Sequence, residues 1–314
     1  MPHRGARTLI IGLAGLGFIM ARSDSAMAFG FERRPTQWKQ DQGRSITFAI
    51  NMARVPSALP QEQYVAAIRD ALESWKAIDT AQLPFALGER LTDEAKTTPQ
   101  ADGVNMIFWQ PGFVPRDQFA GKAYPFSTEC DILLAPRPPF TLIDIRAIVM
   151  HELGHCLGLA HSLATGVMTK FAGLPSLGYD DRIAVSLLYP HPRHALRETT
   201  ATLTGRVVHH RGDPLSGAVL RLIDRATGRV ILAGFSGLVA DQRRGDPSGA
   251  FEIPGVPPGR HRLRIEPMDA FSAADPEGYG APEGAPRDFP PRTIELPDLE
   301  AGQTQDLGTL IVED

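Results

Sequence analysis

Two periodic patterns of hydrophobic and polar positions predict the first elements of the chain. Residues 45–51 alternate with a period of two and are rich in β-branched side chains, which is typical of a strand. Residues 61–76 carry a single apolar stripe with helical spacing, and Pro60 before them suits a first helical turn. The stripe consists of Tyr64, Val65, Ile68, Leu72 and Trp75. Two further apolar runs, 104–109 and 129–134, predict strands.

A second helix is expected to begin at Thr141. Thr141 and Asp144 have the spacing of a capping box, in which each side chain bonds to the backbone N–H of the other residue. The apolar residues that we expect on the buried side of this helix are Ile143, Ile145, Ile148, Val149 and Leu153. The same helix continues into a group of histidines, which gives it a chemical role.

Three histidines around this helix have the spacing of a catalytic metal site. His151 and His155 lie one above the other on a helix, and Glu152 lies about 100° around it, beside a metal ion that the two histidines could share. Gly158 can adopt the left-handed conformation that ends a helix, and the reversal brings His161 back as a third ligand. Three imidazoles leave a tetrahedral zinc one open position for water, from which Glu152 could take a proton.

This HExxHxxGxxH sequence resembles the metzincin metallopeptidases. Ser162, directly after the third histidine, resembles the matrixin branch. Met168 stands at about the offset of the methionine turn that packs beneath the metal ligands, although an ordinary core methionine would look the same. Residues 179–189 resemble the last matrixin helix, which opens with paired aspartates, here Asp180 and Asp181. The resemblance covers residues 29–190.

The resemblance implies an α+β domain with a twisted, mostly parallel sheet and three helices. It implies one catalytic zinc ion (Zn2+) bound by His151, His155 and His161, with Glu152 as the base that activates the water. A second, structural zinc is not expected, because residues 108–126 contain no histidine. Calcium (Ca2+) through Asp131 or neighbouring carbonyl groups is left open. A protein or peptide substrate is expected to bind as an extended strand along residues 120–124, which could equally be a plain sheet edge.

The N-terminal residues 1–28 have the features of a secretory signal peptide. A basic start is followed by a short apolar run and by the small-residue cleavage site Ala26-Met27-Ala28. Export to the periplasm or the extracellular space follows, without a membrane anchor. Matrixins with Phe or Tyr at the mature terminus lead to the hypothesis that the Phe29 ammonium pairs with Asp180 or Asp181. The alternative is a frayed terminus with two aspartates that cap a helix.

The chain has 2 cysteines, Cys130 and Cys156. In an exported protein this number favours one disulfide, which would join a strand to the metal-binding helix. Two buried free thiols, or a metal or regulatory role, are the alternatives.

The pattern changes after Pro190. Residues 191–200 are expected to form a linker, with His191 and His194 as solvated residues. From residue 201 short alternating strands separated by Gly, Pro and Asp predict an all-β sandwich in residues 201–314. The expected strands are 203–208, 218–223, 229–232, 250–253, 261–265 and 307–312. The segments 205–208, 215–218 and 249–259 resemble the carboxypeptidase-regulatory-like domain, a transthyretin-like sandwich, and residues 272–291 suggest a long loop.

Composition fits this two-domain organisation. The 314 residues can bury two cores, and a net charge of -4 without basic clusters gives no support for a nucleic-acid partner or an anionic membrane. The leading prediction is a monomeric, exported zinc endopeptidase. Two alternatives stay open, a surface or envelope binding protein with a vestigial protease domain and a zinc hydrolase restricted to one partner.

Overall fold

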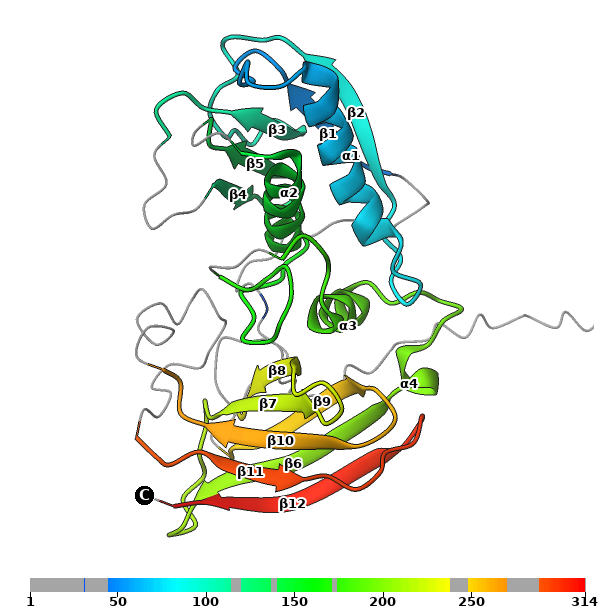
Figure 1. Ribbon diagram of the computed structural model, residues 1–314, viewed down its shortest axis with the longest axis vertical. Helices are drawn as coiled ribbons and strands as arrows, with labels where there is room; N and C mark the ends of the chain where they lie inside the picture. The colour runs from blue at the N-terminus through cyan, green and yellow to red at the C-terminus, as the bar shows by residue number, and fades with distance from the viewer. Residues whose placement is uncertain are drawn as a thin grey trace, which may run out of the picture.

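A computed structural model describes residue 31 and residues 45–113, 120–136, 140–170, 174–237, 248–269 and 288–313. The predicted signal peptide and Phe29 lie outside these residues. Two units are stacked along the long axis of the molecule, an α+β unit and an all-β unit, with helix α3 between them (Figure 1). Among the described residues no helix is both long and apolar enough to cross a membrane.

The first unit contains a five-stranded sheet in the order β2-β1-β3-β5-β4. Neighbouring strands are parallel except β4, which runs antiparallel to β5 at the edge. The elements are β1 (Ile46–Asn51), α1 (Gln61–Lys76), β2 (Phe85–Leu91), β3 (Asn105–Trp109), β4 (Gly121–Pro125), β5 (Cys130–Leu134), α2 (Leu142–Cys156) and α3 (Tyr179–Leu188). The α+β class and the mostly parallel sheet with three helices agree with the prediction.

Helices α1 and α2 pack side by side through buried apolar faces. All five residues of the predicted α1 stripe are buried, and the Trp75 indole Nε1 donates to the Met150 carbonyl of α2 at 3.0 Å. The capping box at the start of α2 is present in both directions, between Thr141 and Asp144. The prediction for Ile143 was wrong, because its side chain is 64% exposed in the first turn, before α2 is covered by its neighbours.

Strand β2 was not predicted, and its sequence explains why. Gly88, Glu89 and Arg90 interrupt the apolar pattern of this edge strand, and only Phe85 of β2 is buried. A Cβ at Gly88 would lie 2.7 Å from the Thr47 side chain, so glycine permits the close approach of β2 to β1. The register between these strands shifts between Phe48 and Ile50.

The second unit is a sandwich of two sheets, one ordered β11-β10-β7-β8 and the other β12-β6-β9. Its strands are β6 (Ala201–His209), β7 (Val219–Asp224), β8 (Val230–Phe235), β9 (Ala250–Val256), β10 (His261–Glu266), β11 (Arg292–Glu295) and β12 (Thr304–Val312). Each predicted strand has a counterpart, and β11, which has no buried residue, was missed. The predicted linker contains a short helix, α4 (Leu196–Thr199).

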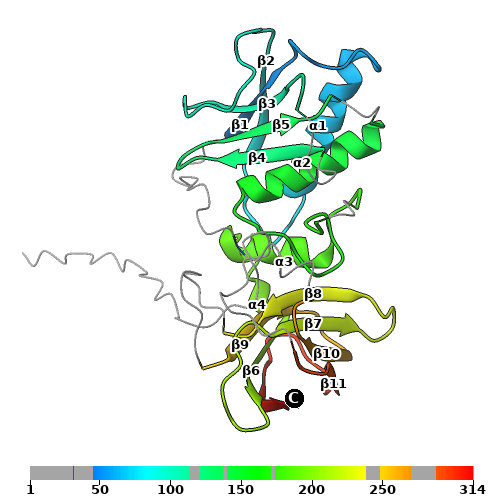
Figure 2. The ribbon, with the colours of Figure 1, turned by 90° about the vertical axis from the view of Figure 1, so that its left-hand side faces the viewer.

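The cores of the two units are continuous. Buried residues of α3, among them Ile183 and Ala184, belong to the same apolar cluster as Leu203 and Val256 of the sandwich. Helix α3 lies next to β8, on the side of the sandwich that faces the first unit (Figures 1 and 2). The two units therefore do not have separate cores; they share an apolar junction at α3.

Candidate metal centre

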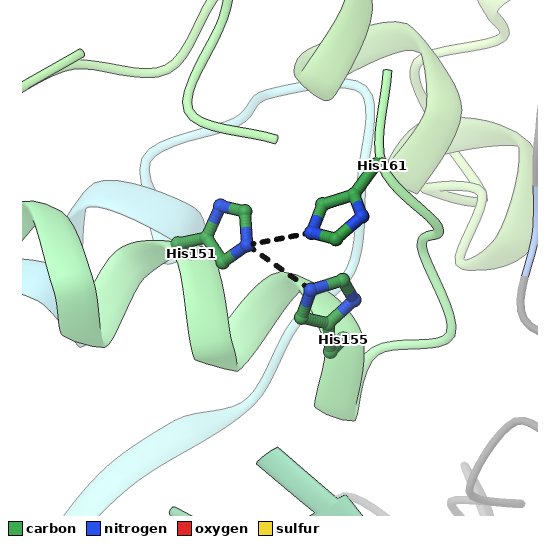
Figure 3. A group of neighbouring side chains, drawn as sticks. All are labelled: His151, His155 and His161. Carbon is green, nitrogen blue, oxygen red and sulfur yellow. Dashed lines mark hydrogen bonds between the residues drawn. The ribbon is translucent and has the colours of Figure 1, made fainter. Parts of the chain in front are cut away.

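Three imidazole rings converge at the C-terminal end of α2 (Figure 3). His151 and His155 come from the helix, and His161 comes from the chain that returns after it. The Nε2 atom of His151 lies 3.1 Å from Nε2 of His155 and 3.3 Å from Nε2 of His161. Within the part of the chain that the structure describes, these histidines form the only such group of three or more metal-ligating side chains.

The outer nitrogens of two of these rings fix their tautomers. His151 Nδ1 lies 2.7 Å from the Val167 carbonyl oxygen, and His155 Nδ1 lies 2.9 Å from the Leu159 carbonyl oxygen. A carbonyl oxygen only accepts, so each Nδ1 carries the hydrogen and each Nε2 of the neutral ring presents a lone pair. Burial is the main cause that lowers the pKa of His151 to about 3, and the neighbouring His155 lowers it further, which keeps the His151 ring neutral.

The residues fit a zinc ion. Where the rings are neutral, lone pairs 3.1–3.3 Å apart repel one another, and a bound cation would remove this repulsion. Two nitrogens bound to a tetrahedral zinc at about 2.0–2.1 Å would stand about 3.3–3.4 Å apart, which is close to the two separations that involve His151. Three imidazole nitrogens are also a donor set that zinc prefers.

The turn after α2 has the geometry that brings His161 back. Gly158 has φ of +96°, in the left-handed region. Its N–H donates to the His155 carbonyl, and the Leu159 N–H donates to the Gly154 carbonyl, each at 2.9 Å, which is the hydrogen-bond pattern of a Schellman motif. The sequence-based role of Gly158 as the end of the helix therefore has a direct structural counterpart.

Glu152 lies beside the three rings and next to strand β4. The side chain is only 5% exposed, and a Cβ at Gly121 would lie 3.0 Å from its Cγ. Burial raises the pKa of Glu152 to about 7, against the lowering effects of His155, the Ala123 backbone and Lys122. Strand β4 is paired on one side with β5 and ends the sheet on the other. An acid–base group thus lies next to the edge strand of the sheet.

Met168 packs beneath the end of α2. A Cβ at Gly154 would collide with the Met168 Sδ atom and would lie 3.3 Å from the Trp75 ring, so the helix has a glycine where the methionine fills the space. Met168 is 1% exposed. The Ser162 N–H donates to the Met168 carbonyl at 2.9 Å, which joins this turn to the residue after His161.

Asp181 holds the turn that contains Met168. Its carboxylate accepts from the N–H groups of Val167, Met168 and Gly178 at 2.7, 3.2 and 2.6 Å. Burial raises the pKa of Asp181 to about 6, although these hydrogen bonds oppose the shift. The sequence named Asp181 through its pairing with a terminal ammonium, and the structure gives it these backbone partners.

Asp180 connects the site to the sandwich. Its Oδ2 accepts from the Ser162 hydroxyl at 2.7 Å, and its Oδ1 accepts from the Ala233 N–H of β8 at 2.9 Å. Burial raises the pKa of Asp180 to about 7. Phe29 lies outside the described residues, so the predicted pairing of its ammonium with Asp180 or Asp181 stays a prediction. The contact with Ala233 had no signal in the sequence, because a backbone donor from a distant strand leaves none.

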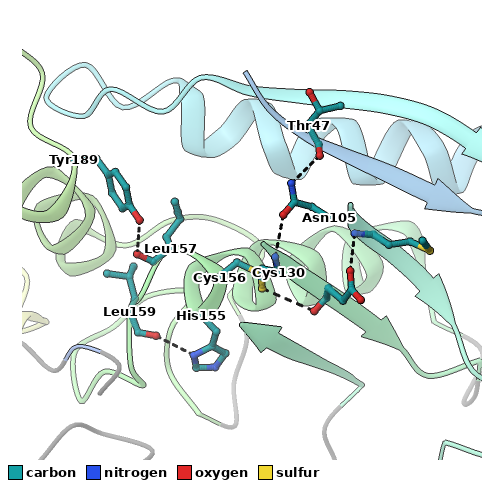
Figure 4. The surroundings of a disulfide bond; sticks show 10 residues. Thr47, Asn105, Cys130, His155, Cys156, Leu157, Leu159 and Tyr189 are labelled. Atoms are coloured by element: carbon teal, nitrogen blue, oxygen red, sulfur yellow. Dashed lines mark hydrogen bonds between the residues drawn. A yellow bond between two sulfur atoms is a disulfide. The ribbon is translucent and has the colours of Figure 1, made fainter. Parts of the chain in front are cut away.

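Cys130 and Cys156 form a disulfide with a Cα–Cα distance of 5.6 Å, which confirms the favoured alternative (Figure 4). It joins β5 to the last residue of α2. Close by, the Asn105 side chain donates to the Thr47 carbonyl at 3.0 Å and accepts from the Cys130 N–H at 2.9 Å. The sheet and the helix that carries His151 and His155 are thereby linked covalently one residue after His155.

Asp131, the residue considered for calcium, has a different set of contacts. Its Oδ2 accepts from the Gln100 N–H at 3.0 Å and its Oδ1 from the Met106 N–H at 2.9 Å. Burial raises its pKa to about 6. Both carboxylate oxygens therefore tie loop and strand backbone together, and the calcium hypothesis gains nothing from this geometry.

Comparison with known proteins agrees with the fold of the first unit. Residues 37–190 match the family model described as Matrixin, so this part of the chain is a matrixin-like domain, of the metallopeptidase kind. A comparison with curated proteins gives no match.

Solved structures overlap with the chain only weakly. One is the Bacillus anthracis TIE protein, with 18% identity, 37% of this chain and 17% of that chain covered and a TM-score of 0.22. Another is BcpA, the major pilin subunit of Bacillus cereus, with 18% identity, 37% and 30% covered and a TM-score of 0.22. The chain spans less than a third of the length of either protein.

Proposed function

We propose that this protein is an exported zinc-dependent endopeptidase. The observation that carries the proposal is the convergence of three imidazole nitrogens with Glu152 beside them, next to the edge strand β4. His151, His155 and His161 would hold the ion. When bound, zinc supplies Lewis-acid activation of water and of a carbonyl group. The matrixin-like domain supports the same reaction class.

The remaining chemistry belongs to the chain itself. A carboxylate oxygen of Glu152 takes a proton from the attacking water and later delivers it to the nitrogen of the leaving amine. The exposed backbone of β4 pairs with a substrate segment in extended conformation, which orients the peptide bond toward Glu152. Such pairing favours unfolded segments, because a folded substrate has few free backbone groups.

Export is the second part of the proposal. The N-terminal sequence supports it, and the disulfide between Cys130 and Cys156 suits an oxidising compartment. The mass of the mature protein isolated from its native host measures this directly. Cleavage after Ala28 is the expected result, and a chain that keeps residues 1–28 in the cytosol would contradict it.

The decisive experiment compares wild type with Glu152→Gln. Glutamine keeps the size and the hydrogen-bonding capacity but cannot take a proton. We expect one zinc per chain in both proteins, and cleavage of an unfolded protein substrate that falls at least about 10³-fold in the variant. If both proteins contain equal zinc and wild type cleaves no member of a peptide library, a hydrolase restricted to one partner would be favoured. Absence of zinc from wild type would favour a binding protein with a vestigial protease domain.

A further inference from the structure

The segment that carries His161 is in contact with the sandwich. The Thr165 N–H donates to the Val230 carbonyl at 3.1 Å. The Leu163 side chain packs against an apolar cluster of the sandwich that consists of Val219, Phe235 and Met268. Residues 162–165 therefore have one hydrogen bond and one apolar contact with the second unit, within four residues of His161.

Asp180 adds an indirect contact. One carboxylate oxygen accepts from Ser162, the neighbour of His161, and the other accepts from the Ala233 N–H at the centre of β8. The carboxyl is 4% exposed, so water competes little with either partner. Residues of both units, among them His161, Asp180, Ala233 and Phe235, line one crevice at this place.

Helix α3 is seated closely on the sandwich next to these contacts. The Tyr179 hydroxyl donates to the Gly255 carbonyl at 2.8 Å. Gly255 has φ of +80°, and a Cβ there would collide with the Ile183 side chain. The approach is thus so close that the sandwich has a glycine at the contact point, and any added atom would push α3 and β9 apart.

We propose that the sandwich contributes to the geometry of the metal site. Strand β8 positions the loop that bears His161 through the contacts of Asp180, Leu163 and Thr165. His161 lies outside any helix, and ordering a loop residue costs backbone entropy. Contacts that order the loop in advance strengthen binding of the ion by all three histidines. Asp180 is in this sense a positioning residue. The inference rests on the proposed zinc-dependent function.

The test measures zinc affinity of the full-length protein by competition with a chromogenic chelator. Asp180→Asn replaces one of the two acceptor oxygens with a donor, and we expect zinc to bind about 10-fold or more weakly. Gly255→Ala pushes the units apart without touching the site, and we expect binding weakened by about threefold or more. Adding Ile183→Ala to Gly255→Ala removes the colliding atoms and should restore affinity.

Gly212→Ala is the matched control. Gly212 also has a left-handed φ, +89°, but nothing lies within 4 Å of its Cβ position. The Gly212→Ala variant should have a lower melting temperature, because alanine is strained at this φ. Its zinc dissociation constant should stay within about twofold of wild type. The visible spectrum of the cobalt-substituted protein gives a second readout, since a displaced His161 changes the ligand field. Ser162→Ala, a smaller change, replaces Asp180→Asn if that variant does not fold.

The outcomes separate the two hypotheses. Suppose that wild type binds zinc and that every variant has the same zinc dissociation constant and the same cobalt spectrum as wild type. That result would overturn this inference and leave the proposed function intact, even where the variants melt at lower temperature. A wild type that binds no zinc would overturn both. Weakened binding in Asp180→Asn and Gly255→Ala, with rescue by Ile183→Ala and no change in Gly212→Ala, supports the inference.

Discussion

The three histidines are held in two different ways. His151 and His155 project from α2, whose start is closed by a capping box, whose middle is bonded to Trp75 and whose end is joined to β5 by the disulfide. His161 follows a turn and lies on a segment that depends on hydrogen bonds to Met168, on Asp180 and on the sandwich. One part of the site is thus built within a single unit, and the other requires two.

This difference predicts separable effects of mutation. Changes that weaken the support of α2 should lower the stability of the first unit and leave the ligand geometry of folded molecules unchanged. Changes at the junction of the two units should act on metal affinity even where they cost little stability.

Removing the disulfide should have the largest effect on stability. The bond closes a loop with a sequence separation of 26, and the chain-entropy relation gives about 3.5 kcal/mol for a loop of this length. We expect Cys130→Ser with Cys156→Ser to lower the free energy of unfolding by about 3 kcal/mol, measured by urea denaturation. The zinc dissociation constant at low temperature should stay within about twofold of wild type. Loss of affinity on the scale of Asp180→Asn would show that the two supports are not separable.

Substitution at Gly154 should affect both supports. Alanine normally favours a helix over glycine by up to about 1 kcal/mol. Here the added methyl collides with Met168, so we expect Gly154→Ala to destabilise the protein by about 1–3 kcal/mol and to weaken zinc binding. A double-mutant cycle with Met168→Ala measures the coupling between the two positions. Additive effects would mean that Met168 does not pack against Gly154 as described.

The sequence specified the α2 side of the site more fully than the His161 side. The histidine spacing, the capping box and the left-handed Gly158 are local signals, because each relates residues within a few positions of one another. The same holds for the α1 stripe. Strands β2 and β11 were missed because edge strands with exposed side chains carry little alternation.

Most partners of Asp180 and Asp181 could not be predicted for a different reason, although the bond of Asp181 to the Gly178 N–H at the start of α3 agrees with the alternative of aspartates that cap a helix. Sequence comparison with a family suggested a terminal ammonium, which is a charged and recognisable partner. The pairing with that ammonium stays a prediction, and the Ser162 hydroxyl is one partner that the structure shows. The other partners that it shows are the backbone N–H groups of Val167, Met168, Gly178 and Ala233. Every residue except proline has such a group, so the choice among them depends on the packing of α3 between the two units.

The pH dependence of stability should identify Asp180 as a buried acid at the junction. Its pKa is raised from 3.8 to about 7, so the folded state favours the protonated form. Its contribution to stability is full at low pH and is lost as pH rises toward 7. From pH 5 to pH 8 the melting temperature of wild type should therefore fall relative to that of Asp180→Asn. Asp181 and His151 titrate in both proteins, so their effects on this difference largely cancel. A difference in melting temperature that stays constant with pH would contradict the raised pKa of Asp180.

Tyr179→Phe should produce the smallest effect, confined to the junction. The variant loses the hydrogen bond from the hydroxyl to the Gly255 carbonyl and keeps the ring, so we expect a loss of about 1 kcal/mol in the free energy of unfolding. Tyr179 does not contact the loop of His161 through any bond that the structure shows, but it fixes α3, which carries Asp180. If the junction acts as a unit, zinc affinity should fall slightly and the effect should vanish in an Asp180→Asn background. An undiminished effect there would place Tyr179 outside the positioning path and would restrict that path to β8 and the loop itself.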